Sequence, residues 1–303
     1  MYDESMILQQ THEYLSQASL TQRTKDNYEH FLRSFFNWFK DTYPEGDPKD
    51  VDPTTVAAWF ATRPAWSSAT KYSAACALRE FYRYHYGETH PVIRVKVKRI
   101  DPGPQRTLDR DELTAILSTV DTTTEKGIRD LAIICLMVDT GMRAGEICRL
   151  EYDRVDLRKR KLTVMTKGGR WQEKMFFEYT AHVLDRWLSL REDMAQPWVN
   201  TFFVSTGGRR RGTPLTISGL RYLFNRLSAL ADVTHISPHA MRRTFATLAI
   251  EGGAPTRLVQ VAGGWQSLRM VERYTQALKP DTMSRYSPIN QIMGLDTDKG
   301  SDH

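Results

Sequence analysis

The sequence has few of the features that mark secreted, membrane-bound or disulfide-rich proteins. Its 303 residues include three cysteines, Cys76, Cys135 and Cys148, which are too widely spaced for a disulfide framework or for clustered zinc ligands. No apolar run approaches the roughly 20 residues that cross a bilayer, and the N-terminus lacks the basic and apolar regions of a signal peptide. We therefore expect a soluble cytoplasmic protein with no membrane partner.

Sites for nucleotides and metals are also missing from the sequence. No segment matches the Gly-x-x-x-x-Gly-Lys-Ser/Thr loop that binds nucleotide phosphates. His235 and His239 are four positions apart, but Ser237-Pro238 marks a helix start between them, so the two imidazoles should not share a face. We expect no metal and no other cofactor.

What the sequence does have is an excess of cations. Lys and Arg total 42 against 36 Asp and Glu, which gives a formal charge of +6 and a pI near 9.1. This balance favours a polyanionic partner such as nucleic acid. A modest positive charge is also common in proteins that bind no polyanion, so composition alone does not establish the partner.

The chain is long enough for two domains, and its first part is predicted to be all-helical. From Leu20 apolar residues recur at three- and four-residue intervals, as on a core-facing helix. Asp52-Pro53 is typical of a second helix start, and Ser67 or Ser68 can cap a third. We assign residues 1–92 to this helical domain.

A segment rich in proline, glycine and cations follows, and we predict a basic linker over residues 93–106. Its cations are Arg94, Lys96, Lys98 and Arg99. They suit a segment that lies along a phosphate backbone. A solvated linker, charged only for solubility, is equally compatible with the composition.

Residues 107–286 are predicted to form a second domain that is mostly helical with one small sheet. Asp109 and Glu112 resemble a capping box, and Gly141 is suited to a left-handed cap after a helix from about Ile128 to Val138. Strand-like runs at 161–165 and 174–177, separated by Gly168-Gly169, indicate a hairpin. The remaining helices are expected at about 180–190, 217–231, 238–251, 256–262 and 268–277.

The stretch from Pro238 to Tyr274 carries the first signs of chemistry. His239 and Arg242 are three positions apart, so they share a helix face and can converge on one anionic group. Displacement at a phosphodiester needs fixed cations on the phosphate oxygens, a nucleophile and a proton donor for the leaving oxygen. Tyr274 is the candidate nucleophile; its free pKa of about 10 requires help from neighbouring groups.

Upstream residues supply further candidates. Arg143 follows Gly141 at the start of a new helix, where guanidinium and backbone amides can meet one phosphate. Lys167 stands at the tip of the predicted hairpin, and Trp265 can donate through its indole N–H. Taken singly, such residues are usually ion-paired or core residues. The ordered set Arg, Lys, His-x-x-Arg, Trp, Tyr is far more specific.

At these residues the sequence resembles the tyrosine recombinase family, also called the phage integrase family. The matching motifs are Thr140-Gly141-Met142-Arg143-Ala144-Gly145-Glu146, Lys167, His239-Ala240-Met241-Arg242-Arg243-Thr244-Phe245-Ala246-Thr247, and Gly263-Gly264-Trp265 followed by Tyr274. The resemblance covers the whole second domain and extends weakly to the first. It implies a helical core-binding domain followed by an α+β catalytic domain with the DNA breaking-rejoining fold.

The resemblance also implies a role for each site residue. Arg143 and Arg242 would clamp the scissile phosphate, Lys167 would protonate the leaving 5′-oxygen, His239 would assist proton transfer, Trp265 would bond a non-bridging oxygen, Tyr274 would form a 3′-phosphotyrosyl bond, and Glu146 would orient the arginines. Many family members carry His where Trp265 stands. Two alternatives stay open: Lys174 instead of Lys167 as the acid, because the hairpin is long, and an ordinary surface role for Glu146. We prefer Lys167, which directly precedes the glycine turn.

By the same resemblance the chain would be a site-specific recombinase of the integrase or resolvase type. It would act as a homotetramer on DNA with specific recombination sites, through a Holliday junction, in the nucleoid, with accessory DNA-bending or directionality proteins as further partners. The tail at 287–303 would dock on a neighbouring protomer. The rival interpretations are a type IB-like topoisomerase and a non-catalytic DNA-binding regulator with the same fold.

Overall fold

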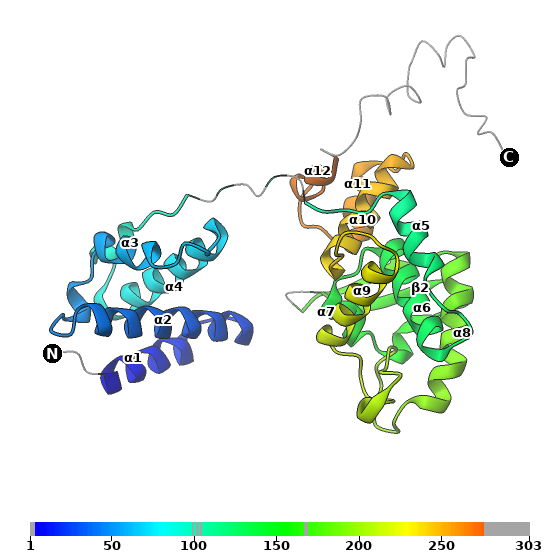
Figure 1. Cartoon of the computed structure of the whole chain (residues 1–303), viewed down its shortest axis with the longest axis horizontal. Helices are drawn as coiled ribbons and strands as arrows, with labels where there is room; N and C mark the ends of the chain where they lie inside the picture. The colour runs from blue at the N-terminus through cyan, green and yellow to red at the C-terminus, as the bar shows by residue number, and fades with distance from the viewer. Residues whose placement is uncertain (1–3, 99, 101–102, 104, 167–168, 276–303) are drawn as a thin grey trace, which may run out of the picture. The chain divides into compact units, whose positions relative to one another are not determined.

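The computed structural model describes residues 4–98, 100, 103, 105–166 and 169–275, with the backbone alone for residue 4 and residues 273–275 (Figure 1). The chain divides into two compact units, 1–102 and 103–303, and the division falls inside the predicted linker. In the part of the chain described, no helix is both long and apolar enough to span a membrane. The predicted tail at 287–303 lies outside the described residues.

The N-terminal unit is built from helices. They are α1 (Glu4–Gln17), α2 (Gln22–Thr42), α3 (Pro53–Ala61) and α4 (Ser68–Tyr86), with the short 3₁₀ turns η1 (Pro48–Asp50) and η2 (Pro91–Arg94). Thr21, Asp52 and Ser67 cap the starts of α2, α3 and α4 by accepting hydrogen bonds from backbone N–H groups. The caps at Asp52 and Ser67 confirm the sequence prediction, whereas α1 was not predicted.

Aromatic side chains form the core of this unit. Phe35, Trp59, Phe36 and Phe81 are at most 2% exposed. Phe35 meets Trp59 edge-on at 5.2 Å, and Phe36 meets Phe81 at the same distance. Such edge-to-face pairs stabilise a core beyond the effect of area burial. Val95 is buried in the same core, so the chain remains packed on this unit through at least that residue.

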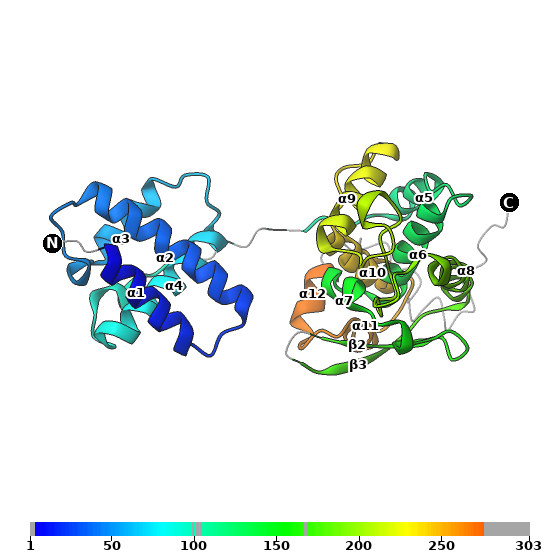
Figure 2. The same ribbon diagram turned by 90° about the horizontal axis from the view of Figure 1, so that it is seen from below.

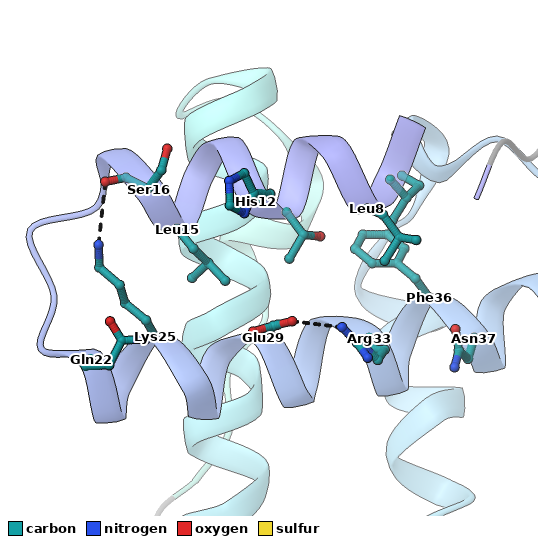
Figure 3. Close-up of a pocket in the computed structure, with 12 residues that line it drawn as sticks. Leu8, His12, Leu15, Ser16, Gln22, Lys25, Glu29, Arg33, Phe36 and Asn37 are labelled. Atoms are coloured by element: carbon teal, nitrogen blue, oxygen red, sulfur yellow. Dashed lines mark hydrogen bonds and ion pairs between the residues drawn. The ribbon is translucent and has the colours of Figure 1, made fainter. Parts of the chain in front are cut away.

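A cavity of about 750 Å³ lies between α1 and α2 in the N-terminal unit (Figure 3). Its cations are already engaged: Arg33 pairs with Glu29 at 2.8 Å, and the Lys25 ammonium donates to the Ser16 carbonyl at 3.5 Å. None of the predicted catalytic residues lines it. All the residues that line the cavity belong to the N-terminal unit.

The second unit combines helices with one small sheet, which confirms the predicted fold class. Its elements are α5 (Arg110–Ser118), α6 (Glu125–Thr140), α7 (Ala144–Arg149), η3 (Tyr152–Arg154), β1 (Val155–Asp156), β2 (Lys161–Met165), β3 (Trp171–Met175), α8 (Glu178–Met194), η4 (Gly208–Arg210), α9 (Ile217–Leu230), α10 (Pro238–Glu251), α11 (Thr256–Gly263) and α12 (Arg269–Thr275).

Helix α6 is the centre of this unit, with α8 and α10 packed against it (Figure 1). The helix is buried along nearly its whole length and ends at Gly141, whose φ of 60° is left-handed as predicted. A Cβ atom at Gly141 would lie 2.4 Å from the Phe245 ring of α10. Glycine is required there both by the backbone angle and by the close packing of α10.

The sheet is antiparallel in the order β1-β2-β3, and Figure 2 shows β2 and β3 side by side along one side of the unit. Met165 pairs with Trp171 and Lys161 with Met175. The second hairpin strand thus begins at Trp171, three residues earlier than the predicted start at Lys174. The prediction missed this because Trp171, Glu173 and Met175 face outward, so the strand lacks an apolar run.

Candidate active site

Arg143 and Glu146 form a paired unit at the start of α7. The Glu146 carboxylate accepts hydrogen bonds from the backbone N–H of Arg143 at 2.7 Å and from its guanidinium Nη1 at 2.7 Å. Glu146 is 3% exposed, which excludes the alternative of an ordinary surface charge. A buried carboxylate with two such donors holds the guanidinium in one orientation.

Arg242 lies on α10, one turn after the helix start, and is 2% exposed. Its Nη1 donates to the carbonyl of Gly141, two residues before Arg143. Its guanidinium carbon lies 4.3 Å from the centre of the Trp265 ring, a cation–π contact. The end of α6 and the turn after α11 therefore hold Arg242 between them, next to Arg143.

Trp265 is 5% exposed and packs in a small apolar cluster. Its ring stacks on Phe245 at 6.1 Å with an interplanar angle of 10°, beside Val259 and Val271. The chain passes closely over it, because a Cβ atom at Gly263 would lie 1.8 Å from the indole ring. Packing accounts for this burial; the hydrogen bond from Trp265 to a phosphate oxygen stays a prediction.

His239 stands in the first turn of α10 and remains exposed. Desolvation by the surrounding protein lowers the pKa of its imidazole, and Arg243, Arg242 and Arg143 lower that pKa further. The group is consequently neutral at neutral pH and able to accept a proton. Both predicted phosphate-binding arginines, Arg143 and Arg242, are thus close enough to His239 to affect its pKa.

Lys174 is a site residue whose surroundings the sequence did not predict. It faces inward from β3, is 3% exposed, and donates from Nζ to the carbonyls of Thr140 at 3.1 Å and Ala262 at 2.6 Å. Desolvation lowers its pKa to about 7, with Arg242 and Arg143 adding to the shift and Glu146 opposing it. The alternation of inward and outward positions along the hairpin was the available signal.

Two of the predicted catalytic residues are described only in part or not at all. Lys167 lies outside the described residues. Tyr274 lies in α12, and its side chain is not described. Helix α12 packs against α10, and Val271 of α12 is fully buried. The helix that contains Tyr274 is therefore in contact with the helix that contains His239 and Arg242.

The predicted linker cations that the structure describes belong to the N-terminal unit. Arg94, Lys96 and Lys98 are exposed, and Arg99 lies outside the described residues. Their contact with DNA stays a prediction.

Together the described residues form a cationic site on a buried acid. The Arg143 guanidinium is bonded to the buried Glu146, that of Arg242 is bonded to the nearby Gly141 carbonyl, and both arginines lower the pKa of the His239 imidazole. Paired arginine forks match the oxygens of a phosphate group, and an imidazole beside them can exchange a proton with a reacting hydroxyl. The arrangement is chemically suited to phosphoryl transfer.

Known proteins are similar to this chain in sequence and in fold. Residues 106–280 match the model of the phage integrase family. The tyrosine recombinase XerC of Bacillus pumilus is 32% identical over 223 residues, 69% of this chain and 71% of that protein. XerC of Staphylococcus carnosus is 28% identical over 269 residues, 87% of this chain and 80% of that protein. In fold, the chain is similar to the XerH site-specific recombinase bound to palindromic difH substrate, with a TM-score of 0.73 at 20% identity over 95% of this chain and 90% of that one.

Proposed function

The chain belongs to the phage integrase family and is a tyrosine-type site-specific DNA recombinase, and from this premise we propose that Tyr274 cuts DNA while Arg143 and Arg242 hold the scissile phosphate. The observation that carries this proposal is that Glu146 holds the Arg143 guanidinium, the nearby Gly141 carbonyl holds that of Arg242, and both arginines lower the pKa of His239. Fixed guanidinium groups stabilise the charge that grows on the phosphate oxygens in the transition state.

The proposed reaction is a transesterification at phosphorus. The phenolic oxygen of Tyr274 attacks phosphorus and joins the 3′ end of the strand, while the bond from phosphorus to the 5′-oxygen breaks. His239, neutral at neutral pH, takes the phenol proton. Lys167 gives a proton to the leaving 5′-oxygen. In the second step a 5′-hydroxyl attacks the phosphotyrosyl bond and releases Tyr274, so phosphodiester energy is conserved without a nucleotide cofactor.

The burial of Lys174 supports Lys167 as the acid. A proton donor for the 5′-oxygen has to reach DNA, and the Lys174 ammonium is 3% exposed and bonded to two backbone carbonyls. Lys167 precedes Gly168-Gly169 in the hairpin turn, between Thr166 and Arg170, whose backbone groups pair at 2.8 Å. Because the Lys174 amine is engaged in the interior, Lys167 stays the preferred donor.

Each unit receives a separate task in the proposal. The helical domain at 1–92 grips DNA, the linker at 93–106 lies along the backbone with Arg94, Lys96, Lys98 and Arg99 on phosphates, and the domain at 107–286 is catalytic. Four protomers exchange strands between two duplexes through a Holliday junction, and the tail at 287–303 docks in trans. Accessory DNA-bending or directionality proteins would act on this assembly.

Covalent capture tests the chemistry and identifies the recombination site at the same time. The full chain is incubated with a pool of random-sequence duplexes that each carry one nick, and DNA that stays attached under denaturing conditions is recovered and sequenced. We expect an enriched sequence with wild type and none with Tyr274→Phe, which keeps the ring but not the nucleophile. Absence of any adduct with wild type contradicts the proposal and favours a non-catalytic DNA-binding protein.

A plasmid with two copies of the enriched sequence then separates recombination from relaxation. We expect deletion or inversion products whose type follows the relative orientation of the two sites. Relaxed plasmid without such products would favour a type IB-like topoisomerase instead.

A further inference from the structure

Helices α6 and α11 end in the same way, and each end presents a site residue. Both are followed by a left-handed glycine, Gly141 with φ 60° and Gly264 with φ 70°. Arg143 comes two residues after the first glycine, and Trp265 comes directly after the second. The last carbonyls of a helix lack intrahelical partners and carry partial negative charge, so a cation is favourable at such an end.

One side chain binds both helix ends at once. From β3, Lys174 donates to the carbonyl of Thr140, the last residue of α6, and to that of Ala262 in the last turn of α11. The guanidinium of Arg242 is held by the same two turns, through the Gly141 carbonyl on one side and the Trp265 ring on the other. Lys174 and Arg242 thus each connect the end of α6 with the end of α11.

We propose that Lys174 is a positioning residue: by joining the ends of α6 and α11, its amine sets the gap in which Arg242 lies and so the aim of Arg242 at the phosphate. This inference rests on the proposed function, because the aim of Arg242 matters only if a phosphate reacts there. Lys174 itself is buried and touches no substrate. Misplacement of a catalytic group by about 1 Å is enough to lower a rate about 100-fold.

The bridge does not depend on the charge of the amine. A neutral amine still has two N–H groups, enough for the carbonyls of Thr140 and Ala262. The charged groups that act on Lys174 are Glu146, Arg143 and Arg242, with desolvation as the main cause of its lowered pKa, about 7. A positioning role therefore survives deprotonation, whereas a role as proton donor would be lost as pH rises through that value.

Gln172 offers a matched control on the same strand. Its Nε2 donates to the carbonyl of Val261 at 2.9 Å, so it ties β3 to α11 but makes no hydrogen bond to α6. Gln172→Met removes the attachment to one helix end, and Lys174→Met removes the bridge between two. Lys174→Arg keeps N–H donors at the position of the bridge.

The experiment compares wild type, Lys174→Met, Lys174→Arg and Gln172→Met on the duplex enriched by covalent capture. We expect Lys174→Met to form adduct about 10- to 100-fold more slowly, equally on both sides of pH 7, with DNA affinity within about twofold of wild type when both carry Tyr274→Phe. Lys174→Arg should recover part of the rate, and Gln172→Met should stay near wild type. An unchanged rate in Lys174→Met overturns the proposal, as does a loss confined to low pH or an equal loss in Gln172→Met.

Hydrogen exchange keeps the test independent of DNA cleavage. In Lys174→Met the amides of residues 141–147 and 262–266 should exchange faster than in wild type, while Gln172→Met should affect only 262–266. Unchanged exchange at both turns contradicts the bridge even if wild type forms no adduct. A missing adduct in wild type alone, with the exchange pattern as expected, would contradict the proposed function and leave the bridge in place.

Discussion

The two units differ most in what they bury. Among the described residues of the N-terminal unit, the buried polar side chains are Thr11 and His90, and the core is aromatic and aliphatic. The second unit buries charges of both signs, namely Arg129, Asp130, Glu146, Lys174, Arg191, Arg242 and Arg243. Burial of a charge is costly unless it is paired and hydrogen-bonded. The second unit bears this cost, which points to a task beyond folding.

The buried charges of the second unit are themselves of two kinds. Asp130 pairs with Arg129 at 2.6 Å and with Arg226 at 2.5 Å, a closed network within the core. Glu146 instead pairs with the Arg143 guanidinium, which stays partly exposed, and Arg242 is held by the carbonyl of Gly141, two residues earlier in the chain. Internal pairing stabilises a fold, whereas buried groups that support a partly exposed cation prepare a site for an anion. Single substitutions can separate these two uses.

Substitution of a buried arginine at the site should have the largest effect. We expect Arg242→Lys to slow adduct formation about 100- to 1,000-fold, because lysine cannot donate as a planar fork to two phosphate oxygens. The control is Arg191→Lys, a buried arginine that also donates to backbone carbonyls, those of Thr201 and Val199. Single-turnover adduct formation measures both variants; equal rate losses would mean that Arg242 acts only in the fold.

Two arginine–glutamate pairs at helix starts in the second unit allow a similar comparison. Glu146 accepts from Arg143, and Glu112 accepts from Arg106 at 2.6 and 2.9 Å. Glu146→Gln removes the charge that orients the site arginine and should lower the adduct rate about 10-fold. Glu112→Gln should leave that rate within about twofold of wild type. A harmless Glu146→Gln would show that its carboxylate only caps α7.

The buried amine predicts how stability depends on pH. The pKa of Lys174 is about 7 in the folded protein and about 10.4 in the unfolded chain. Between these values the unfolded state holds the proton and the folded state does not, so stability rises with pH, by at most about 1.4 kcal/mol per pH unit. Denaturant titrations at several pH values give the unfolding free energies of wild type and Lys174→Met. The difference between the two proteins isolates this rise.

The control for this titration is Lys161→Met on the same hairpin. Lys161 is partly exposed and paired with Glu173 at 2.7 Å, which raises its pKa, so its removal should not alter the slope between pH 7 and 10. A flat difference between wild type and Lys174→Met would mean that the amine is hydrated in the folded protein.

The linker cations should have the smallest effect. We expect Lys96→Gln and Lys98→Gln each to weaken DNA binding a few-fold and to reduce the slope of log affinity against log salt by about 1. Lys49→Gln is the control, because Asp47 already pairs with that lysine at 2.9 Å. Binding isotherms at several salt concentrations give the slopes; unchanged slopes in the linker variants would assign those cations to solubility.

The caps at helix ends could be predicted from the sequence, whereas contacts between residues far apart in the chain could not. The Asp109–Glu112 box, the Ser67 cap and the left-handed Gly141 follow from side-chain and backbone preferences within a few residues, and each was found as predicted. Lys174 differs because its partners, Thr140 and Ala262, are far away in the chain. Alternation along the hairpin indicates that Lys174 faces inward, but its burial also depends on the ends of α6 and α11 lying beside β3, which no local pattern predicts.

The most direct test of the account is the identity of the residue that becomes bonded to DNA. The adduct obtained by covalent capture is digested with nuclease and trypsin and analysed by mass spectrometry. We predict a nucleotide phosphate on the peptide from Tyr274 to Arg285, which contains no other tyrosine. Attachment to any other residue, or DNA retention that persists in Tyr274→Phe, would contradict the claim that Arg143, Arg242 and the buried Glu146 serve a phosphate attacked by Tyr274.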